Sequence, residues 1–328
     1  MSNFFNFKPR LRAPIVCLFS LLPLLVMAKP ATFNANDTAV GSITKPSLAS
    51  NEGMVEGIFY QTFGSGRPVL IINGGPGLDS AGFEPVAKAI AAKGYQTILF
   101  DQRGTGRSTL PKIDGSTIQM SLMVEDIEKL RSHLKQPKLT ILGHSFGGML
   151  GAAYAAKYPE HVEKLIFSSA GGLDLSFREQ FSKRFNANLT LTEQAKMQAY
   201  QLQQAAGDDS AETRDALALV RAHAYVIDKS KAPAIAARLK VVNMAINGLV
   251  YQDLEKIQFD LKSSFRDFKA PVLVLQGDKD VIGVDTAKTI ANSFPDARLV
   301  IMPNCAHYGW LDSAELDYAS VFEFIQAP

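Results

Sequence analysis

The sequence predicts an α/β fold in which a mostly parallel, doubly wound sheet is covered by helices and carries an inserted helical cap. Short, continuous apolar runs recur along the chain, and amphipathic helical patterns fall between several of them. This alternation is typical of parallel strands joined by right-handed crossover helices. Between 172 and 262 the apolar runs stop and helical patterns replace them. We therefore predict a core, 54–171 and 263–328, and a cap, 172–262; a separate all-helical domain is the alternative for the cap.

The strands are predicted from runs rich in Val, Ile and Leu that are bounded by Gly, Pro or polar residues. Because these runs do not alternate with polar residues, they indicate strands buried on both faces. They read PVLIING, QTILFDQ, KLTILGH, KLIFSSA, PVLVLQG and ARLVIMP in chain order. The stretch GIFYQTFG before them does alternate, and it predicts an edge strand.

Helical spacing is clearest in SLMVEDIEKLRSHLK, whose apolar residues recur at intervals of four and three and share one face. AGFEPVAKAIAAKG predicts another helix of the core, with Gly94 as the signal that ends it. The cap is predicted to be helical from LTEQAKMQAYQLQQAAG, ETRDALALVRAHAYVI and APAIAARLKVVNMAINGLV. Its insertion after a strand places it over the carboxyl ends of the sheet, where open α/β sheets bind ligands.

The N-terminus predicts export. MSNFFNFKPRLR is basic and lacks acidic residues, and the apolar run APIVCLFSLLPLLVMA follows it. A basic segment, a short apolar segment and small residues at their end form the pattern of a secretory signal peptide, here 1–28. The protein is then periplasmic or secreted, with no stable membrane partner. The alternative is an uncleaved anchor at 13–28, although a spanning helix needs roughly 20 apolar residues. Residues 29–53 have no periodicity and predict a poorly ordered arm.

Composition excludes several classes of function. Hydrophobic residues make up 47% of the chain, charged residues 20%, and the net charge is +2 with Lys and Arg scattered, so no nucleic-acid partner is predicted. The two cysteines are Cys17 and Cys305. Removal of the signal peptide would leave one of them, and therefore no intramolecular disulfide. No His or Cys cluster has metal-ligand spacing, so neither a metal nor an organic cofactor is predicted.

Ser145 is predicted to be a nucleophile. It stands in ILGHSFGGML, where the strand KLTIL precedes the turn GHSFGG and a small-residue helix follows it. A strand, Gly-x-Ser-x-Gly and a helix form a sharp turn that raises the serine above the sheet. Gly143 and Gly147 leave room where a Cβ would collide with the neighbouring backbone. The alternative, a hydroxyl in an ordinary loop, does not require this context.

A nucleophilic serine needs a base, and the base needs an orienting acid. His307 lies in MPNCAHYGW, just after the last predicted strand and therefore at the same edge of the sheet as Ser145. The acid is expected in GDKD after the preceding strand, where Asp278 and Asp280 are the candidates. Asp278 adjoins the glycine turn and is interpreted as shaping it. Asp280 is therefore predicted to hold one tautomer of His307.

The run IINGGPGLDS predicts an oxyanion hole, because its glycines let the backbone turn N–H groups into a cavity. In sites of this kind one donor comes from such a loop and one from the residue after the nucleophile. We therefore predict that the N–H groups of Gly75 and Phe146 are the donors. Gly74 and Trp310 are predicted to border the substrate. An ordinary glycine-rich turn is the alternative, whereas a phosphate-binding loop is disfavoured because its motifs are missing.

Four stretches together carry a resemblance to a known family. They are NGGPG at 73–77, FDQRGTGRS at 100–108, VEDIEKLRSHL at 124–134 and GHSFGG at 143–148. With them, the core resembles the α/β-hydrolase superfamily, and specifically its proline iminopeptidase branch. The resemblance implies the α/β-hydrolase fold and a serine hydrolase that removes an N-terminal residue, typically proline, from short peptides. It also implies the roles given above to Ser145, Asp280 and His307.

The same resemblance implies that acidic residues of the cap bind the free α-amine of the substrate. The acidic residues Glu193, Asp208, Asp209, Glu212 and Asp215 are candidates by charge alone. Solvated helix charges are the simpler interpretation of them. DQRGTGRS is interpreted as structural, with Asp101 and Arg103 forming a charge-assisted pair that organises the loop.

The predicted function is a serine hydrolase with a Ser-Asp-His triad, and preferably an aminopeptidase that releases proline or another small residue from a small peptide. An esterase, a lactonase or a small-amide hydrolase acting on a small acyl substrate is the alternative. A non-catalytic binding protein on the same scaffold is the third hypothesis, since a fold does not fix a function. The oligomeric state is left open.

Overall fold

The structure is a computed structural model that describes residues 50–327. The predicted signal peptide at 1–28, the alternative anchor at 13–28 and the arm as far as residue 49 lie outside the described residues. Within the described part of the chain, no helix is long and apolar enough to cross a membrane.

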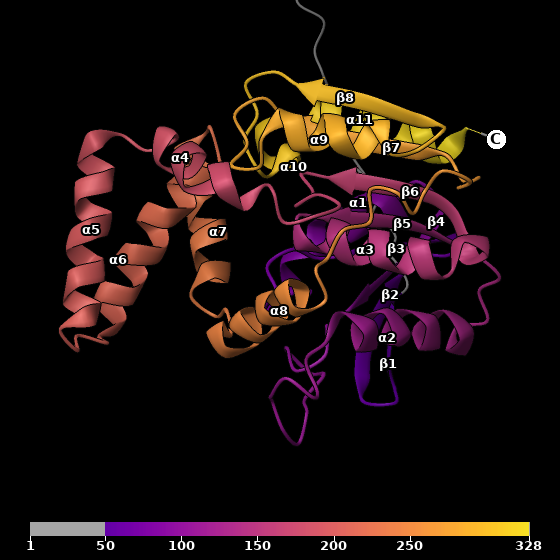
Figure 1. Ribbon diagram of the computed structural model, residues 1–328, viewed down its shortest axis with the longest axis horizontal. Coiled ribbons are helices and arrows are strands. Elements are labelled where there is room, and N and C mark those ends of the chain that lie inside the picture. Colours follow the sequence, from indigo (N-terminus) through magenta and orange to yellow (C-terminus); the bar gives the residue numbers. More distant parts are fainter. Residues whose placement is uncertain (1–49, 328) are drawn as a thin grey trace, which may run out of the picture. The chain divides into compact units, whose positions relative to one another are not determined.

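The described residues form one eight-stranded sheet (Figure 1). Its strands, in their order across the sheet, are β1 (Ser50–Val55), β2 (Ile58–Phe63), β4 (Tyr95–Phe100), β3 (Arg67–Ile72), β5 (Leu139–His144), β6 (Val162–Ser168), β7 (Val272–Gly277) and β8 (Ala297–Met302). β2 pairs antiparallel with β1 and β4, and the other pairs are parallel. The mostly parallel sheet of the sequence prediction is therefore confirmed.

The two edges of the sheet differ from the prediction. Residues 50–53, assigned to the arm, belong to β1, so GIFYQTFG forms the inner strand β2 rather than an edge strand. Glu56 and Gly57 connect the two strands with φ values of 47° and 84°, which is the geometry of a tight two-residue hairpin. The prediction missed β1 because SNEGMV has little apolar content. At the opposite edge, β8 is only partly buried, since no further strand covers it.

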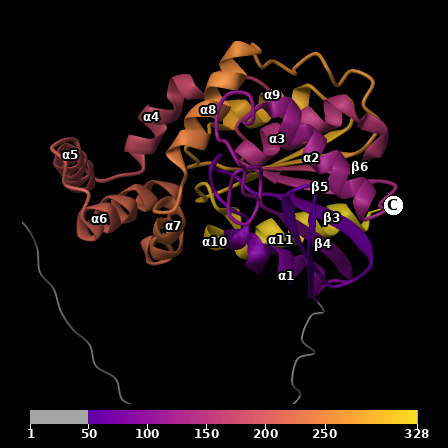
Figure 2. The same ribbon diagram turned by 90° about the horizontal axis from the view of Figure 1, so that it is seen from below.

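Helices cover both faces of the sheet. α2 (Met120–His133), α3 (Phe146–Lys157) and α9 (Val284–Asn292) pack on one face, and α1 (Glu84–Ala91) and α11 (Ala314–Gln326) pack on the other (Figure 2). The continuous apolar runs supply both interfaces. In β3, Leu70 and Ile72 face the first group of helices, whereas Val69 and Ile71 face the second.

The cap consists of α4 (Arg178–Ala187), α5 (Leu191–Ala205), α6 (Ala211–Ala222), α7 (Ala232–Leu239) and α8 (Met244–Lys256). The last predicted helical stretch is thus divided into α7 and α8, because Asn243 caps α8 by accepting hydrogen bonds from the N–H groups of Ala245 and Ile246. Short helices connect the longer elements: η1 (Ala81–Phe83), η2 (Pro159–His161), η3 (His223–Tyr225), η4 (Lys229–Lys231) and α10 (Gly309–Asp312).

The cap is inserted between β6 and β7 and lies to one side of the sheet in both views (Figures 1 and 2). It shares its packing with the core: Ile246 and Val250 of α8 belong to the main apolar cluster, and Tyr308 of the core packs into the small cluster between α6 and α7. The N–H of Asn243 also donates to the carbonyl of Gly77 at 2.8 Å.

The order of the strands locates a crevice. β3 lies between β4 and β5, so the chain continues from β3 to one side and later returns to the other. Open α/β sheets bind ligands at the carboxyl ends of the strands where the order reverses in this way. The segments that follow β3 and β5 are the NGGPG loop and the turn that carries Ser145.

Candidate active site

Ser145 occupies a strained turn between β5 and α3. Its φ of 54° and ψ of −120° lie in a region that residues with a side chain rarely adopt. The turn is held by hydrogen bonds from the N–H of Ser145 to the carbonyl of Ser168 at 3.0 Å and from the N–H of Gly171 to the carbonyl of Ser145 at 3.1 Å. A Cβ at Gly147 would lie 2.1 Å from the carbonyl oxygen of Ile72, so the motif needs glycine there for steric reasons.

The structure joins Asp280 to His307. The carboxylate of Asp280 accepts a hydrogen bond from Nδ1 of His307 at 2.8 Å, and both side chains are buried, at 2% and 5% exposure. It also accepts hydrogen bonds from the N–H of Ile282 at 2.9 Å and from Nε2 of Gln276 at 2.7 Å. Three donors therefore hold one buried carboxylate, which fixes the ring of His307 with Nε2 as the free nitrogen.

The loop around Asp278 has the structural part that the sequence predicted for it. Oδ1 of Asp278 accepts a hydrogen bond from the N–H of Cys305 at 3.2 Å, and the N–H of Asp278 donates to the carbonyl of Met302. Asp278 thereby ties the end of β7 to the loop that carries His307.

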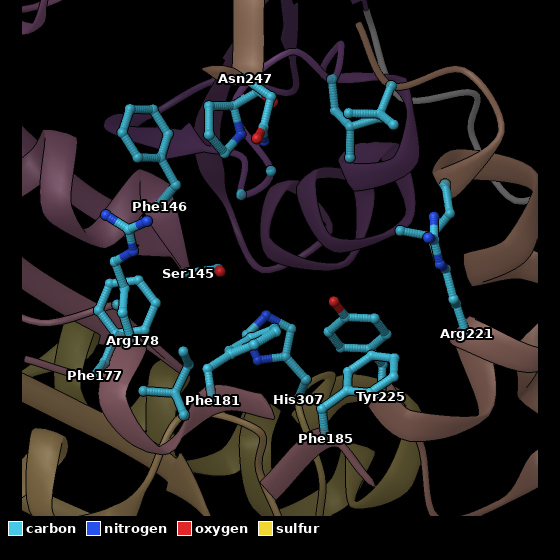
Figure 3. Close-up of a pocket in the computed structure, with 18 of the residues that line it drawn as sticks. Ser145, Phe146, Phe177, Arg178, Phe181, Phe185, Arg221, Tyr225, Asn247 and His307 are labelled. Carbon is cyan, nitrogen blue, oxygen red and sulfur yellow. Dashed lines mark hydrogen bonds between the residues drawn. The ribbon is translucent and has the colours of Figure 1, made fainter. Parts of the chain in front are cut away.

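Ser145 and His307 line the same cavity, and the imidazole faces the serine hydroxyl across it (Figure 3). Among the described residues no hydrogen bond joins the two side chains. Such bonds are often loose without substrate and tighten when the reacting group binds. The arrangement therefore brings the three predicted triad residues to one site. Asp280 and His307 are hydrogen-bonded, whereas Ser145 and His307 are not.

Gly74, Gly75 and Phe146 also border this cavity. Gly75 has a φ of 76°, and a Cβ at Gly74 would lie 2.6 Å from Cβ of Ser145, so the NGGPG loop passes directly beside Ser145. Phe146 is the first residue of α3, where a backbone N–H has no partner within the helix. Within 50–327, neither the N–H of Gly75 nor that of Phe146 donates to a protein acceptor. Both groups are thus available to an oxygen bound beside Ser145.

Two predicted roles differ from the structure. Trp310 does not line the cavity, because its ring packs behind it against His144 and Phe83, with centroids 4.8 and 5.2 Å apart.

Arg103 does not pair with Asp101; it makes a bidentate pair with Asp126 of α2 at 2.6 and 2.7 Å. Asp101 instead accepts hydrogen bonds from two backbone N–H groups. One belongs to Ser80, which follows the NGGPG loop, and the other to Arg107 in its own segment. The DQRGTGRS segment remains structural, with other partners.

The structure adds His144 to the site. It lines the cavity, and its ring lies 4.7 Å from that of His307. Its Nδ1 contacts Oγ of Ser168 at 3.3 Å, and its Nε2 is buried without a partner among the described residues. Burial, and then the nearby positive charges of His307 and Arg238, hold the pKa of His144 well below its usual value. The site therefore favours the neutral form of His144.

The cap forms the outer walls of a cavity of about 770 Å³. Aromatic rings dominate these walls: Phe177, Phe181 and Phe185 come from α4 and its N-terminal end, Tyr225 from η3 and Tyr251 from α8. The N–H of His307 donates to the carbonyl of Tyr225 at 3.1 Å, so the cap also holds the loop that carries His307. No motif in the sequence indicated these residues, because only the folding of the cap brings them over Ser145.

The acidic cap residues considered for amine binding lie elsewhere. None of the five acidic residues named above lines the cavity. Glu193 forms the capping box of α5 with Thr190 and contacts Nδ1 of His223 at 2.5 Å. Asp209 and Asp215 form exposed ion pairs with Arg214 and Lys240. Over residues 50–327, no group of His, Cys, Asp or Glu side chains could hold a metal ion.

Comparison with known proteins agrees with this architecture. A family model described as the alpha/beta hydrolase fold matches residues 67–314. A proline iminopeptidase from Heyndrickxia coagulans is 26% identical over 281 residues, which cover 82% of this chain and 95% of the relative. The chain is therefore similar to the proline iminopeptidase branch, as the motifs indicated.

Other hydrolases are similar to a comparable degree. A protein named putative carbamate hydrolase RutD from Caulobacter sp. (strain K31) is 25% identical over 288 residues, covering 83% of this chain and 97% of the relative. Among solved structures, an esterase from Exiguobacterium antarcticum superposes with a TM-score of 0.64 at 19% identity, covering 82% of this chain and 96% of that one. The structural likeness at this identity concerns the fold alone.

Proposed function

Because the chain belongs to the alpha/beta hydrolase fold family, we propose that it is a serine hydrolase that forms an acyl-enzyme at Ser145. The observation that carries the proposal is the buried pair of Asp280 and His307, which faces a serine held on a strained turn. Strain of this kind persists only where the surrounding structure enforces it, and it concentrates at functional sites.

The mechanism follows from these positions. Oγ of Ser145 attacks the carbonyl carbon of the substrate while Nε2 of His307 accepts the hydroxyl proton. Asp280 holds the Nδ1–H tautomer and stabilises the imidazolium without taking its proton. The N–H groups of Gly75 and Phe146 stabilise the oxyanion, and each such donor is worth roughly 3–4 kcal/mol in the transition state. His307 then protonates the leaving group, and water releases the acyl group.

An active-site probe tests this chemistry against the non-catalytic hypothesis. A fluorophosphonate should label the folded wild-type protein at Ser145, and Ser145→Ala should abolish the labelling. Ser116→Ala is the matched control, because Ser116 lies on an exposed loop outside the cavity and should leave labelling intact. A folded wild-type protein that resists the probe would instead favour a binding protein.

The curated relatives favour a narrower activity, the release of N-terminal proline or another small residue from short peptides. Two of the motifs that carry this resemblance, NGGPG and GHSFGG, contribute residues to the cavity. An aminopeptidase must recognise a free α-amine, and a positively charged amine is best bound by a carboxylate. In the described part of the chain no carboxylate side chain lines the cavity.

The cavity itself favours the second candidate, an esterase or small-amide hydrolase. Its aromatic walls suit an apolar acyl or leaving group, and the formally charged side chains that line it, Arg178 and Arg221, are cations that do not suit an ammonium group. The two candidates are separated by comparing prolyl and alanyl arylamides with short acyl esters. An aminopeptidase should cleave the free arylamides and lose this activity when the amine is acetylated. Faster turnover of esters, with no effect of acetylation, would support the second candidate.

A further inference from the structure

The charged side chains that line the cavity within residues 50–327 include two arginines but no carboxylate. Arg178 of α4 and Arg221 of α6 line it, and among residues 50–327 no Asp or Glu does so. A cavity of about 770 Å³ is large enough for a small organic substrate. Positively charged walls of this kind favour a substrate that carries negative charge.

The two arginines differ in their partners. Arg178 forms an ion pair with Glu255 of α8, and its guanidinium lies 5.3 Å from the centroid of the Tyr251 ring. In the described chain Arg221 has neither a hydrogen-bond acceptor nor a carboxylate partner. Arg214, on the same helix, pairs with Asp209 at 2.9 Å. Arg221 is thus the cation of the cavity whose planar donor groups remain available.

Tyr225 and Arg221 both line the cavity, on the side opposite Phe146 and Arg178 (Figure 3). Its ring contacts that of His307 at a centroid distance of 5.4 Å. Burial raises the pKa of Tyr225, and the charge of Arg221 partly opposes this rise. The phenol is therefore a neutral hydroxyl that can donate a hydrogen bond in the same cavity as the guanidinium.

We propose that Arg221, assisted by the hydroxyl of Tyr225, binds a carboxylate on the substrate while Ser145 attacks its ester or amide carbonyl. The planar guanidinium matches a carboxylate with two parallel hydrogen bonds, and partial removal from water strengthens them. The inference deepens the proposed function and rests on it. It makes the preferred substrate an anionic ester or amide with an apolar segment between its two polar ends.

Paired substrates test the assignment. The p-nitrophenyl half-esters of glutarate and adipate are compared with the uncharged p-nitrophenyl esters of the same chain lengths. For the wild-type protein, kcat/KM should be higher for at least one half-ester. In Arg221→Met, the ratio of kcat/KM values for the charged and uncharged esters should fall by roughly 10–100-fold, as expected for loss of hydrogen bonds to a charged group. Arg221→Lys should retain part of that preference, because it keeps the charge but not the planar donors.

Two controls fix the position of the effect. Arg214→Met removes a cation from the same helix outside the cavity and should leave the ratio unchanged. Arg178→Met removes the cation that is already paired with Glu255 and should change the ratio less than Arg221→Met does. Free adipate should inhibit hydrolysis of the uncharged ester by the wild-type protein, and this inhibition should weaken in Arg221→Met. This test does not depend on where the carboxylate lies in the natural substrate.

The possible failures are distinguishable. If Ser145 reacts with a fluorophosphonate and the uncharged ester is hydrolysed, but the ratio does not change in Arg221→Met, the carboxylate site is wrong and the serine hydrolase stands. A larger effect in Arg178→Met also overturns the assignment. If neither ester is hydrolysed and the folded protein resists the probe, the proposed function itself fails. Labelling of Arg221→Met at the wild-type rate verifies that this variant is folded.

Discussion

The turn that carries Ser145 and the cap helices above it are built in opposite ways. Every residue from His144 to Leu150 is buried except Ser145, which is partly open to the cavity, and the backbone of the turn is fixed by neighbouring strands. By contrast, α4 and α5 contain no buried residue, and Leu191 and Leu202 of α5 are 83% and 64% exposed. The proposed acyl transfer needs positions accurate to a fraction of an ångström, and the groups proposed for it lie on the buried part.

The cap contributes the outer walls of the cavity, which would contact the remainder of the proposed substrate. Because α4 and α5 bury little surface, their residues can change with a small effect on stability. The comparison therefore leads us to propose that the core determines the chemistry and that the cap determines the choice of substrate. Four predictions test or refine this division, beginning with the largest expected effect.

Asp280→Asn should lower kcat by roughly 10⁴-fold, because an amide can donate to Nδ1 and thus favour the wrong tautomer of His307. The change is nearly isosteric, so the core should still fold. Steady-state kinetics with a p-nitrophenyl ester measure the effect. Asp278→Asn is the matched control from the same loop, and it should lose far less activity. Equal losses in both variants would mean that Asp280 acts only by holding the loop.

Gly147→Ala should destabilise the protein by more than about 4 kcal/mol, or prevent folding, since the new Cβ would meet the carbonyl of Ile72 at 2.1 Å. Gly248→Ala provides the contrast in the cap. Gly248 lies inside α8 with nothing within 4 Å of the added Cβ, so alanine should stabilise the helix by about 0.5–1 kcal/mol. Urea denaturation of both variants measures the two free energies of unfolding. A Gly147→Ala protein of wild-type stability would contradict the rigid turn.

The features of the core that were predictable are those with a local signal. Buried strands appear as continuous apolar runs, and the turn at Ser145 is a short motif whose glycines have a steric cause. The order of strands and turns then placed His307 and Asp280 at the same edge. β1 was missed because its side chains are mostly exposed, and Trp310 was assigned to the cavity although it packs behind it.

The cap could not be predicted at the same level. Its helices were recognisable from periodicity, but which side chains face Ser145 depends on the angles between α4, α6 and α8. Arg221 and Tyr225 lie in sequence among ordinary helical residues, and no spacing separates them from Arg214. The pairing of Arg103 with Asp126 rather than Asp101 is a similar case. The folded position of α2 decides which carboxylate Arg103 reaches, and the sequence does not show that position.

Asp317 tests whether the rigid core tolerates a buried charge. It lies on α11 at 5% exposure, and burial raises its pKa to about 7. The folded protein then binds a proton at Asp317 more tightly than the unfolded chain does. The free energy of unfolding therefore falls as the pH rises from about 4, near the unfolded pKa, through about 7, the folded pKa. Asp317→Asn should therefore add about 2–4 kcal/mol to the free energy of unfolding at pH 8 and little at pH 4. Thermal unfolding at both values measures it, with the exposed Asp215→Asn of the cap as the control.

The smallest effect is expected on the surface of the cap. Leu202→Gln on α5 should change the free energy of unfolding by less than about 0.5 kcal/mol, because the side chain is 64% exposed and little apolar area is lost. Leu150→Ala on α3, where the side chain is fully buried, should cost about 2–5 kcal/mol by comparison. Urea denaturation and kcat/KM for one ester are measured on both variants. A loss of stability in Leu202→Gln comparable to that in Leu150→Ala would mean that α5 is packed against something in solution. The loosely packed cap would then be a covered surface, and the division between core and cap would have to be redrawn.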